Sequence, residues 1–239
     1  MDGSALQVYN GPISFPTEGR HVIVYRAIDR TDNISSEQIY SVFVDGTPPD
    51  GLASVDGPLF IDGNKIYISP RSAIVLWAED NLSGVDTIYV SLDGGGYIAY
   101  TEPMTIDRDG RHSATAYAVD NVGNKTAEFK VEGYVDSTPP VVRITSKDQF
   151  VTVDGKNYTN RSNEYEISAY DNLSGVRNIL VSLDGSEYVA YTSPFMVQAP
   201  GRHVLRAKAV DNLGNESSFR ELTFFTDVTP PEATMGASV

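Results

Sequence analysis

The stretch Gly201–Asp211, with the sequence GRHVLRAKAVD, decides the fold. Apolar and polar residues alternate along it, and successive side chains of a β-strand point to opposite faces of a sheet. Leu205 and the alanines that follow it therefore share a small, apolar face, whereas Arg206 and Lys208 lie on the other face. The alternation predicts a strand at 203–210 that packs on one side and meets water on the other, as in an antiparallel sandwich.

The motif that opens this stretch recurs along the chain. Gly-Arg-His begins at Gly19, Gly110 and Gly201, which sets a period of 91 residues. Other markers keep that period, namely Thr47, Thr138 and Thr229 of Thr-Pro-Pro, Asp29, Asp120 and Asp211, Tyr9, Tyr100 and Tyr191, and Asp2, Asp93 and Asp184 of Asp-Gly. A repeat of this length is too long for a solenoid unit and suits one sandwich domain.

Thr-Pro-Pro marks the boundaries of the repeats, because proline cannot continue a strand ladder and stiffens the chain. The division gives two complete repeats, 49–138 and 139–229. Residues 2–48 correspond to the C-terminal half of a preceding repeat, and residues 230–239 to the start of a following repeat or a linker. We therefore expect the chain to be an excerpt of a longer array.

Runs rich in Val, Ile, Tyr and Phe, separated by Gly, Asn, Asp and Pro, indicate strands throughout. In the last repeat these runs are 141–145, 165–170, 176–183, 188–191, 195–197, 203–210 and 219–226. No segment carries a long helical apolar stripe. The predicted fold is all-β, with tandem immunoglobulin-like antiparallel β-sandwich domains.

Composition restricts the partners. The 239 residues carry a net charge of −14, which repels phosphate backbones and anionic lipid, so we expect no nucleic acid and no membrane insertion by this segment. Divalent cations are the natural small counterions. The absence of cysteine excludes disulfides and thiolate metal sites.

The run VSLDGSEYVAYTSP at 181–194, followed by Gly-Arg-His, AVDNLGN at 209–215 and Thr-Pro-Pro, resembles bacterial immunoglobulin-like repeats of large surface and secreted proteins. In particular, these repeats resemble the variety found in leptospiral outer-membrane adhesins. The resemblance implies a non-catalytic structural or adhesive spacer, extracellular or on the cell surface, with a host or matrix protein or a glycan as partner. Such repeats also accompany exported enzymes, so an accessory carbohydrate- or protein-binding module of a polysaccharide-degrading enzyme is the alternative.

Acidic turns are the candidate sites. The predicted strand order brings two turns of each sandwich to the pole where the preceding linker enters. Carboxylates with neighbouring amides are the hard oxygen donors that Ca²⁺ prefers, so Ca²⁺ is the candidate cofactor. Asp-Asn turns also form as Asx-turns without an ion, and both interpretations stay open. The residues are Asp45, Asp80, Asn81, Asp120 and Asn121 at one domain junction, and Asp136, Asp171, Asn172, Asp211 and Asn212 at the next.

The histidines occupy equivalent positions in the repeats. His21, His112 and His203 each open a predicted strand, where immunoglobulin domains place the tyrosine of the tyrosine corner. We predict a hydrogen-bonded position at the edge of the core for each of them. No nucleophile motif accompanies them, and we predict no enzymatic activity.

Two other groups of aromatic residues invite interpretation. In Tyr97/Tyr100 and Tyr188/Tyr191, positions i and i+3 of a strand face opposite sides, so one tyrosine of each pair should pack inward and the other cover an edge. Exposed tyrosines would suit glycan stacking. Trp77, beside Leu76, is predicted to lie in a core.

The N-terminal segment lacks the predicted first strands of a sandwich. Alone it would expose a sandwich interior, so we expect self-association with the same segment of another chain, or a different phase of the structural unit. Its turn at 29–33, DRTDN, departs from the DNVGN pattern at 120–124.

Overall fold

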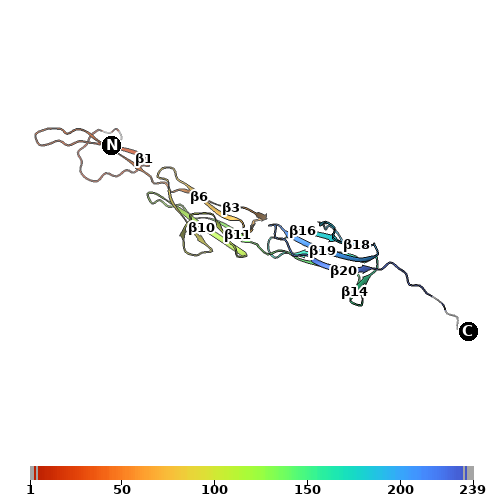
Figure 1. Ribbon diagram of the computed structural model, residues 1–239. Helices are drawn as coiled ribbons and strands as arrows, with labels where there is room; N and C mark the ends of the chain where they lie inside the picture. The colour runs from red at the N-terminus through yellow and green to blue at the C-terminus, as the bar shows by residue number, and fades with distance from the viewer. Residues whose placement is uncertain (1–2, 4, 234, 236–239) are drawn as a thin grey trace. The chain divides into compact units, whose positions relative to one another are not determined.

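The computed structural model describes residues 3, 5–233 and 235, and this part of the chain folds into β-strands without a helix (Figure 1). Asp2, at one end of the repeat pattern, and residues 234 and 236–239 of the expected last segment lie outside the described residues. No helix that could cross a membrane is found in the described part. Contacts divide the chain into a first unit (1–56, 73–104 and 112–132) and a second unit (57–72, 105–111 and 133–239).

The third repeat lies entirely within the second unit. Its strands are β12 (Val141–Ser146), β13 (Val151–Val153), β14 (Lys156–Thr159), β15 (Glu164–Tyr170), β16 (Val176–Leu183), β17 (Val189–Ala190), β18 (Phe195–Met196), β19 (Gly201–Asp211) and β20 (Arg220–Thr226). They form a three-stranded sheet, β12-β15-β18, and a six-stranded sheet, β13-β14-β20-β19-β16-β17. All of the pairings are antiparallel except β14 with β20, which is parallel. The predicted all-β sandwich is confirmed.

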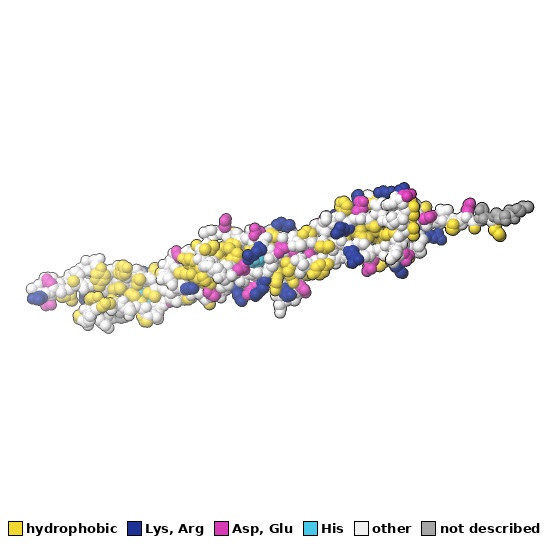
Figure 2. Space-filling view, turned by 90° about the horizontal axis from the view of Figure 1, so that it is seen from below, with side chains coloured by type: hydrophobic (Ala, Val, Ile, Leu, Met, Phe, Trp, Pro, Cys, Tyr) yellow, Lys and Arg dark blue, Asp and Glu magenta, His cyan; other side chains and the backbone are white. Residues whose placement is uncertain are grey.

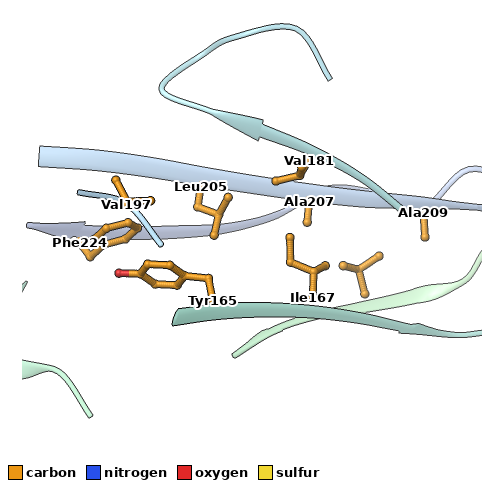
Figure 3. Packing of buried hydrophobic residues seen from close by; sticks show 9 residues of the cluster. Tyr165, Ile167, Val181, Val197, Leu205, Ala207, Ala209 and Phe224 are labelled. Atoms are coloured by element: carbon orange, nitrogen blue, oxygen red, sulfur yellow. The ribbon is translucent and has the colours of Figure 1, made fainter. Parts of the chain in front are cut away.

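One face of β19 supplies the core of this repeat. Leu205, Ala207 and Ala209 are fully buried, which confirms the alternation predicted for this strand. Tyr165 of β15 stacks on Phe224 of β20, with the ring centroids 4.5 Å apart. Figure 3 shows Tyr165 on one sheet facing the side chains of the other. The two faces therefore close over a dry layer that stabilises the sandwich.

The second repeat uses the same order of strands. They are β3 (Asp50–Asp56), β4 (Leu59–Asp62), β5 (Lys65–Ile68), β6 (Ala73–Glu79), β7 (Val85–Leu92), β8 (Ile98–Ala99), β9 (Met104–Thr105), β10 (Gly110–Asp120) and β11 (Phe129–Val135). In the first unit β3 pairs antiparallel with β6, and β7 pairs with β8 and β10. In the second unit β5 pairs antiparallel with β4 and parallel with the end of β11.

The N-terminal segment holds one antiparallel pair, β1 (Gly19–Tyr25) with β2 (Gln38–Val44). Tyr25 is 55% exposed and Tyr40 is 60% exposed. Their large apolar side chains therefore remain in contact with solvent.

Two features differ from the sequence analysis. The hairpins β4–β5 and β13–β14 were not predicted, although Asp154-Gly155, with φ of 49° and 72°, is a two-residue turn typical of hairpins. Trp77 was predicted to be in the core, and this is wrong, because the side chain is 51% exposed. Its neighbour Leu76 faces inward, and adjacent residues of a strand face opposite sides.

Candidate cation-binding clusters

Two groups of three aspartates are formed at the ends of strands. The C-terminal cluster comprises Asp136, directly after β11, Asp171, directly after β15, and Asp211, the last residue of β19. One carboxylate oxygen from each lies within 4.8 Å of the other two. All three residues belong to the second unit. The N-terminal cluster, Asp45, Asp80 and Asp120, has the same relation to β2, β6 and β10, and lies in the first unit.

The position of Asp211 follows from the strand that carries it. Asp211 has the same parity as Ala209 and so points to the core side, where it is completely buried. Beside it the ladder to β16 shifts by one residue, because Val176 pairs with Asp211 whereas Asn178 pairs with Val210. A bulge of this kind re-aims the adjacent side chain. The same shift occurs next to Asp120 in β10.

Backbone amides hold two of the carboxylates of the C-terminal cluster. Asp136 Oδ2 accepts a hydrogen bond from Ser174 N at 2.9 Å, and its Oδ1 accepts one from Thr138 N at 3.1 Å. Asp211 Oδ1 accepts from Asn215 N at 2.8 Å, and Asn215 Nδ2 donates to Asp211 Oδ2 at 2.6 Å. Asp136 and Asp211 are both fully buried.

The third carboxylate is only half satisfied. Asp171 Oδ1 accepts from Leu173 N at 3.0 Å and from Gly175 N at 2.8 Å. Its Oδ2 is buried and has no hydrogen-bond partner. In the same loop Ser174 Oγ is also buried without a partner, and Ser174 as a whole is 3% exposed. Two oxygen atoms with unused bonding capacity therefore lie at this cluster.

The N-terminal cluster repeats this arrangement. Asp45 Oδ2 accepts from Ser83 N at 2.9 Å, Asp80 Oδ2 accepts from Gly84 N at 2.9 Å, and Asp120 Oδ2 accepts from Asn124 Nδ2 at 2.7 Å. Here too the other oxygen of Asp80 and the hydroxyl of Ser83 are buried without partners. Equivalent atoms are therefore unsatisfied in two independent copies of the arrangement.

The hydrogen bonds keep the carboxylates charged. Ser83, whose backbone amide donates to Asp45 and whose hydroxyl adjoins that carboxylate, lowers the pKa of Asp45 from its ordinary value, although burial and the charge of Asp120 act in the opposite direction. Burial raises the pKa of Asp120, but its hydrogen bonds from Asn124 and neighbouring amides outweigh burial, so that this pKa is also lowered. At neutral pH these two carboxylates are ionised, and they repel one another.

Two of the four predicted asparagines hold loops together. Asn121 Nδ2 donates to the carbonyl oxygens of Ser83 and Gly84 at 2.9 Å, and Asn212 Nδ2 makes the equivalent bonds in the third repeat. Asn81 Nδ2 donates to Glu18 at 2.6 Å, and Asn172 is exposed.

Sequence reasoning missed four residues that belong to the clusters. These are the unsatisfied Ser83 and Ser174, and the bonding Asn124 and Asn215. Their signal was present, because each of them recurs after 91 residues within the Ser-Gly and Gly-Asn pairs of the same turns.

The histidines lie at the core edge, as predicted. His203 Nε2 lies 2.8 Å from Ala199 O, and its Nδ1 lies 2.8 Å from Asp184 Oδ2. His112 makes the equivalent contact with Asp93 at 2.7 Å. Burial raises the pKa of Asp184, but the hydrogen bonds with His203 and Val204 N, together with the charges of His203 and Arg202, outweigh burial, so that this pKa is lowered. Each ring is thus held by a turn.

The two predicted roles of the tyrosine pair are both observed in the second repeat. Tyr100 OH accepts a hydrogen bond from Leu76 N at 3.2 Å. Tyr97 is 40% exposed, packs edge-on against Tyr117 with centroids 4.8 Å apart, and donates to Glu128 at 2.6 Å, which raises the pKa of Tyr97 to about 12. Tyr89 stacks on the same Tyr117 at 5.1 Å. These three rings, Tyr89, Tyr97 and Tyr117, form an aromatic cluster.

The surface carries charges of both signs. On the face shown in Figure 2, Lys and Arg side chains are interspersed with Asp and Glu, and no continuous basic patch appears on it.

Comparison with known proteins gives similarity of fold only. No family model and no curated protein matches the sequence. Among solved structures, the chain is similar to the fibronectin(III)-like modules of Clostridium thermocellum CbhA, with 15% identity, a TM-score of 0.40, and coverage of 77% of this chain and all of that one. It is also similar to dimeric latent PorU from Porphyromonas gingivalis, with 15% identity, a TM-score of 0.29, and coverage of 89% of this chain and 24% of that one. Neither likeness carries an argument about function.

Proposed function

We propose that the chain is a non-catalytic structural or adhesive spacer of a large bacterial surface or secreted protein, of the kind its repeats resemble. One observation carries this proposal. The second and third repeats keep the same strand order and the same buried positions, such as Ala116 and Ala207, at a fixed spacing of 91 residues. A spacer is built from copies of one folding unit at a constant spacing, and these repeats have both properties.

The proposal has a finer part, which concerns stiffness. A cation bound between the three carboxylates of each cluster would join the strand that ends one repeat to two loops of the next. Asp136 follows β11 of the second repeat, whereas Asp171 and Asp211 belong to the third. Fixing these segments to one another would limit bending of the chain there.

Single-molecule force spectroscopy tests the spacer function. A repeat of 91 residues, fully extended, spans about 300 Å. We expect the third repeat, which lies within one unit, to unfold in a single step that releases a length of this order. A spacer that bears load should show this step in every trace. Gradual extension without a discrete step would contradict the proposal.

A second candidate function rests on the aromatic cluster. Tyr89, Tyr97 and Tyr117 form a partly exposed group, and Lys125 lies 3.4 Å above the Tyr117 ring. Exposed aromatic rings can stack on sugars, which suits an accessory carbohydrate-binding module.

The third repeat provides the control for this second function. It has Leu180 and Lys208 at the positions of Tyr89 and Tyr117, and only Tyr188 remains from the aromatic cluster. In a glycan array, binding that is lost in Tyr97→Ala and kept in Tyr188→Ala would support the accessory module. Equal loss in both variants, or no binding at all, would remove it.

A further inference from the structure

We propose that the C-terminal cluster is a Ca²⁺ site formed by Asp136, Asp171, Asp211 and the hydroxyl of Ser174, and that the N-terminal cluster is a second, weaker site. This inference deepens the stiffening part of the proposed function. It can fail alone, since a spacer without bound cations would still unfold repeat by repeat.

Charge is the first argument. Three carboxylates with oxygens within 4.8 Å of one another repel strongly, and Asp136 and Asp211 are shielded from water by complete burial. Burial of charge is costly unless the charge is paired or coordinates a metal. A divalent cation would add positive charge to that of Arg71, whose Nη2 donates to Leu213 O in the Asp211 turn at 3.3 Å.

Unused oxygen atoms are the second and independent argument. Buried polar atoms nearly always have a hydrogen-bond partner, and exceptions call for a cause such as an ion. At the C-terminal cluster Asp171 Oδ2 and Ser174 Oγ have none. Ser174 N donates to Asp136 Oδ2, so the residue with the free hydroxyl adjoins the carboxylates. The same two atoms are free in Asp80 and Ser83.

The turn at Asp29 separates this inference from plain turn chemistry. Asp29 is equivalent to Asp211 and lies in no three-carboxylate group among the described residues. Both of its oxygens are nevertheless occupied, because Oδ1 accepts from Thr31 and Asn33 backbone amides and Oδ2 accepts from Asn33 Nδ2. The Asx-turn at Asp29 therefore forms without an ion, and both carboxylate oxygens are hydrogen-bonded within the turn. Turn formation alone thus explains the hydrogen bonds of Asp211. It does not explain the unpaired Asp171 Oδ2 and Ser174 Oγ beside it.

The donor set selects the cation. All of the donors are oxygens, which suit Ca²⁺ or Mg²⁺ rather than Zn²⁺. Ca²⁺ binds oxygens at about 2.3–2.6 Å, so that ligands on opposite sides of the ion lie about 5 Å apart, whereas Mg²⁺ requires about 4 Å. Three carboxylate oxygens within 4.8 Å of one another can reach one ion, and Ca²⁺ accepts several protein oxygens in flexible geometry, whereas Mg²⁺ keeps most of its waters. Water would complete its six to eight ligands.

The two clusters differ in burial. Asp136 and Ser174 are buried, whereas their counterparts Asp45 and Ser83 are partly exposed. The charge is the same in both, so the less enclosed N-terminal cluster, whose bound ion would be more accessible to water, should bind more weakly.

Isothermal titration of the whole chain with CaCl₂, after treatment with EDTA, tests the inference. We expect two sites, and loss of the tighter one in Asp171→Asn and of the weaker one in Asp80→Asn. Asp148→Asn, which changes an exposed aspartate outside the clusters, is the matched control and should keep both. Less than one Ca²⁺ per chain, an unchanged titration of Asp171→Asn, or complete competition by equimolar Mg²⁺ would overturn the assignment.

Ser174→Ala keeps the test decisive if Asp171→Asn does not fold. We expect this variant to bind Ca²⁺ about tenfold more weakly at the tighter site, an effect of the size seen when supporting groups at metal sites are removed. In EDTA it should melt no lower than the parent chain, because it removes a buried hydroxyl that has no partner. Unchanged affinity, or a lower melting temperature in EDTA, would contradict the role given to Ser174.

Discussion

The N-terminal segment and the third repeat contain equivalent strand pairs with opposite surroundings. Leu205 and Ala207 of β19 are fully buried, whereas Tyr25, which is equivalent to Ala207, is 55% exposed. The ribbon and its register form in both places. The difference lies in the covering sheet, because Tyr165 of β15 packs on β20 in the third repeat. The strand pair is therefore specified locally, whereas burial depends on distant strands.

The turns that follow these strands give the same lesson. Asp29, in an exposed turn, has a pKa lowered to about 2, chiefly by hydrogen bonds from Asn33. Asp32 takes a φ of 65° where the third repeat has Gly214 at 89°, so the departure in sequence leaves the turn intact. Asp211 makes the same turn but is buried, because β11 and β15 bring Asp136 and Asp171 to it.

Removal of the Tyr165 ring should give the largest effect. We expect Tyr165→Ala to destabilise the third repeat by about 3–5 kcal/mol, because a buried aromatic side chain leaves a cavity. Hydrogen exchange of the β19 amides measures this repeat separately. Val42→Ala, at the position equivalent to Phe224 but in the N-terminal segment, should change local stability by about 0.5 kcal/mol or less. Similar effects of the two substitutions would refute the contrast.

The asparagine of the turn gives the next comparison. Asn215→Ala removes the bond to Asp211 Oδ2 and a second bond, at 3.1 Å, to Asp136 O. The loss leaves buried acceptors without donors, and we expect about 1–2 kcal/mol of destabilisation in chemical denaturation. Asn33→Ala acts at an exposed turn, where water replaces the lost bond, and its effect should be much smaller. A larger effect at Asn33 would show that burial is not the cause.

Self-association tests the uncovered face of the N-terminal segment. We propose that a second copy of the chain covers the face that carries Tyr25 and Tyr40, since this face corresponds to the buried side of the third repeat. Sedimentation velocity should detect a dimer, and Tyr25→Lys should weaken it by about tenfold, or about 1.4 kcal/mol. Arg220→Lys, on an exposed strand position, is the control. A monomer at all concentrations would remove the proposal.

Acid should give the smallest effect. The pKa of Asp184 is lowered in the folded state, so the contacts of its ionised carboxylate with His203 Nδ1 and Val204 N stabilise the fold above the unfolded pKa near 4, and this stability is lost as the pH falls through the lower folded pKa. The carboxylate is partly exposed, so we expect less than about 1 kcal/mol. The difference in stability between the parent chain and Asp184→Asn, measured by denaturation, should therefore shrink below pH 4. A constant difference would contradict this role.

The sequence predicts the strands and the meeting of the three carboxylates, but not every part of either. A run rich in Val, Ile and Leu between turn residues identified β16 as 176–183, and the strand order placed Asp171 and Asp211 at one pole. Trp77 was misplaced because a run of apolar residues hides which parity faces inward. Ser174 was missed because the direction of a hydroxyl depends on how its loop folds, and no periodicity encodes that.

Each cluster takes one aspartate from the end of one repeat and two from the next, and the equivalent aspartates of the two clusters are 91 residues apart. This arrangement has a genetic consequence. Recombination that adds or deletes a whole repeat creates a new boundary. At that boundary, as at the existing ones, the aspartate that ends one repeat is followed by the two aspartates of the next repeat. The gene can therefore change the length of its product by whole copies while each new boundary restores a complete cluster.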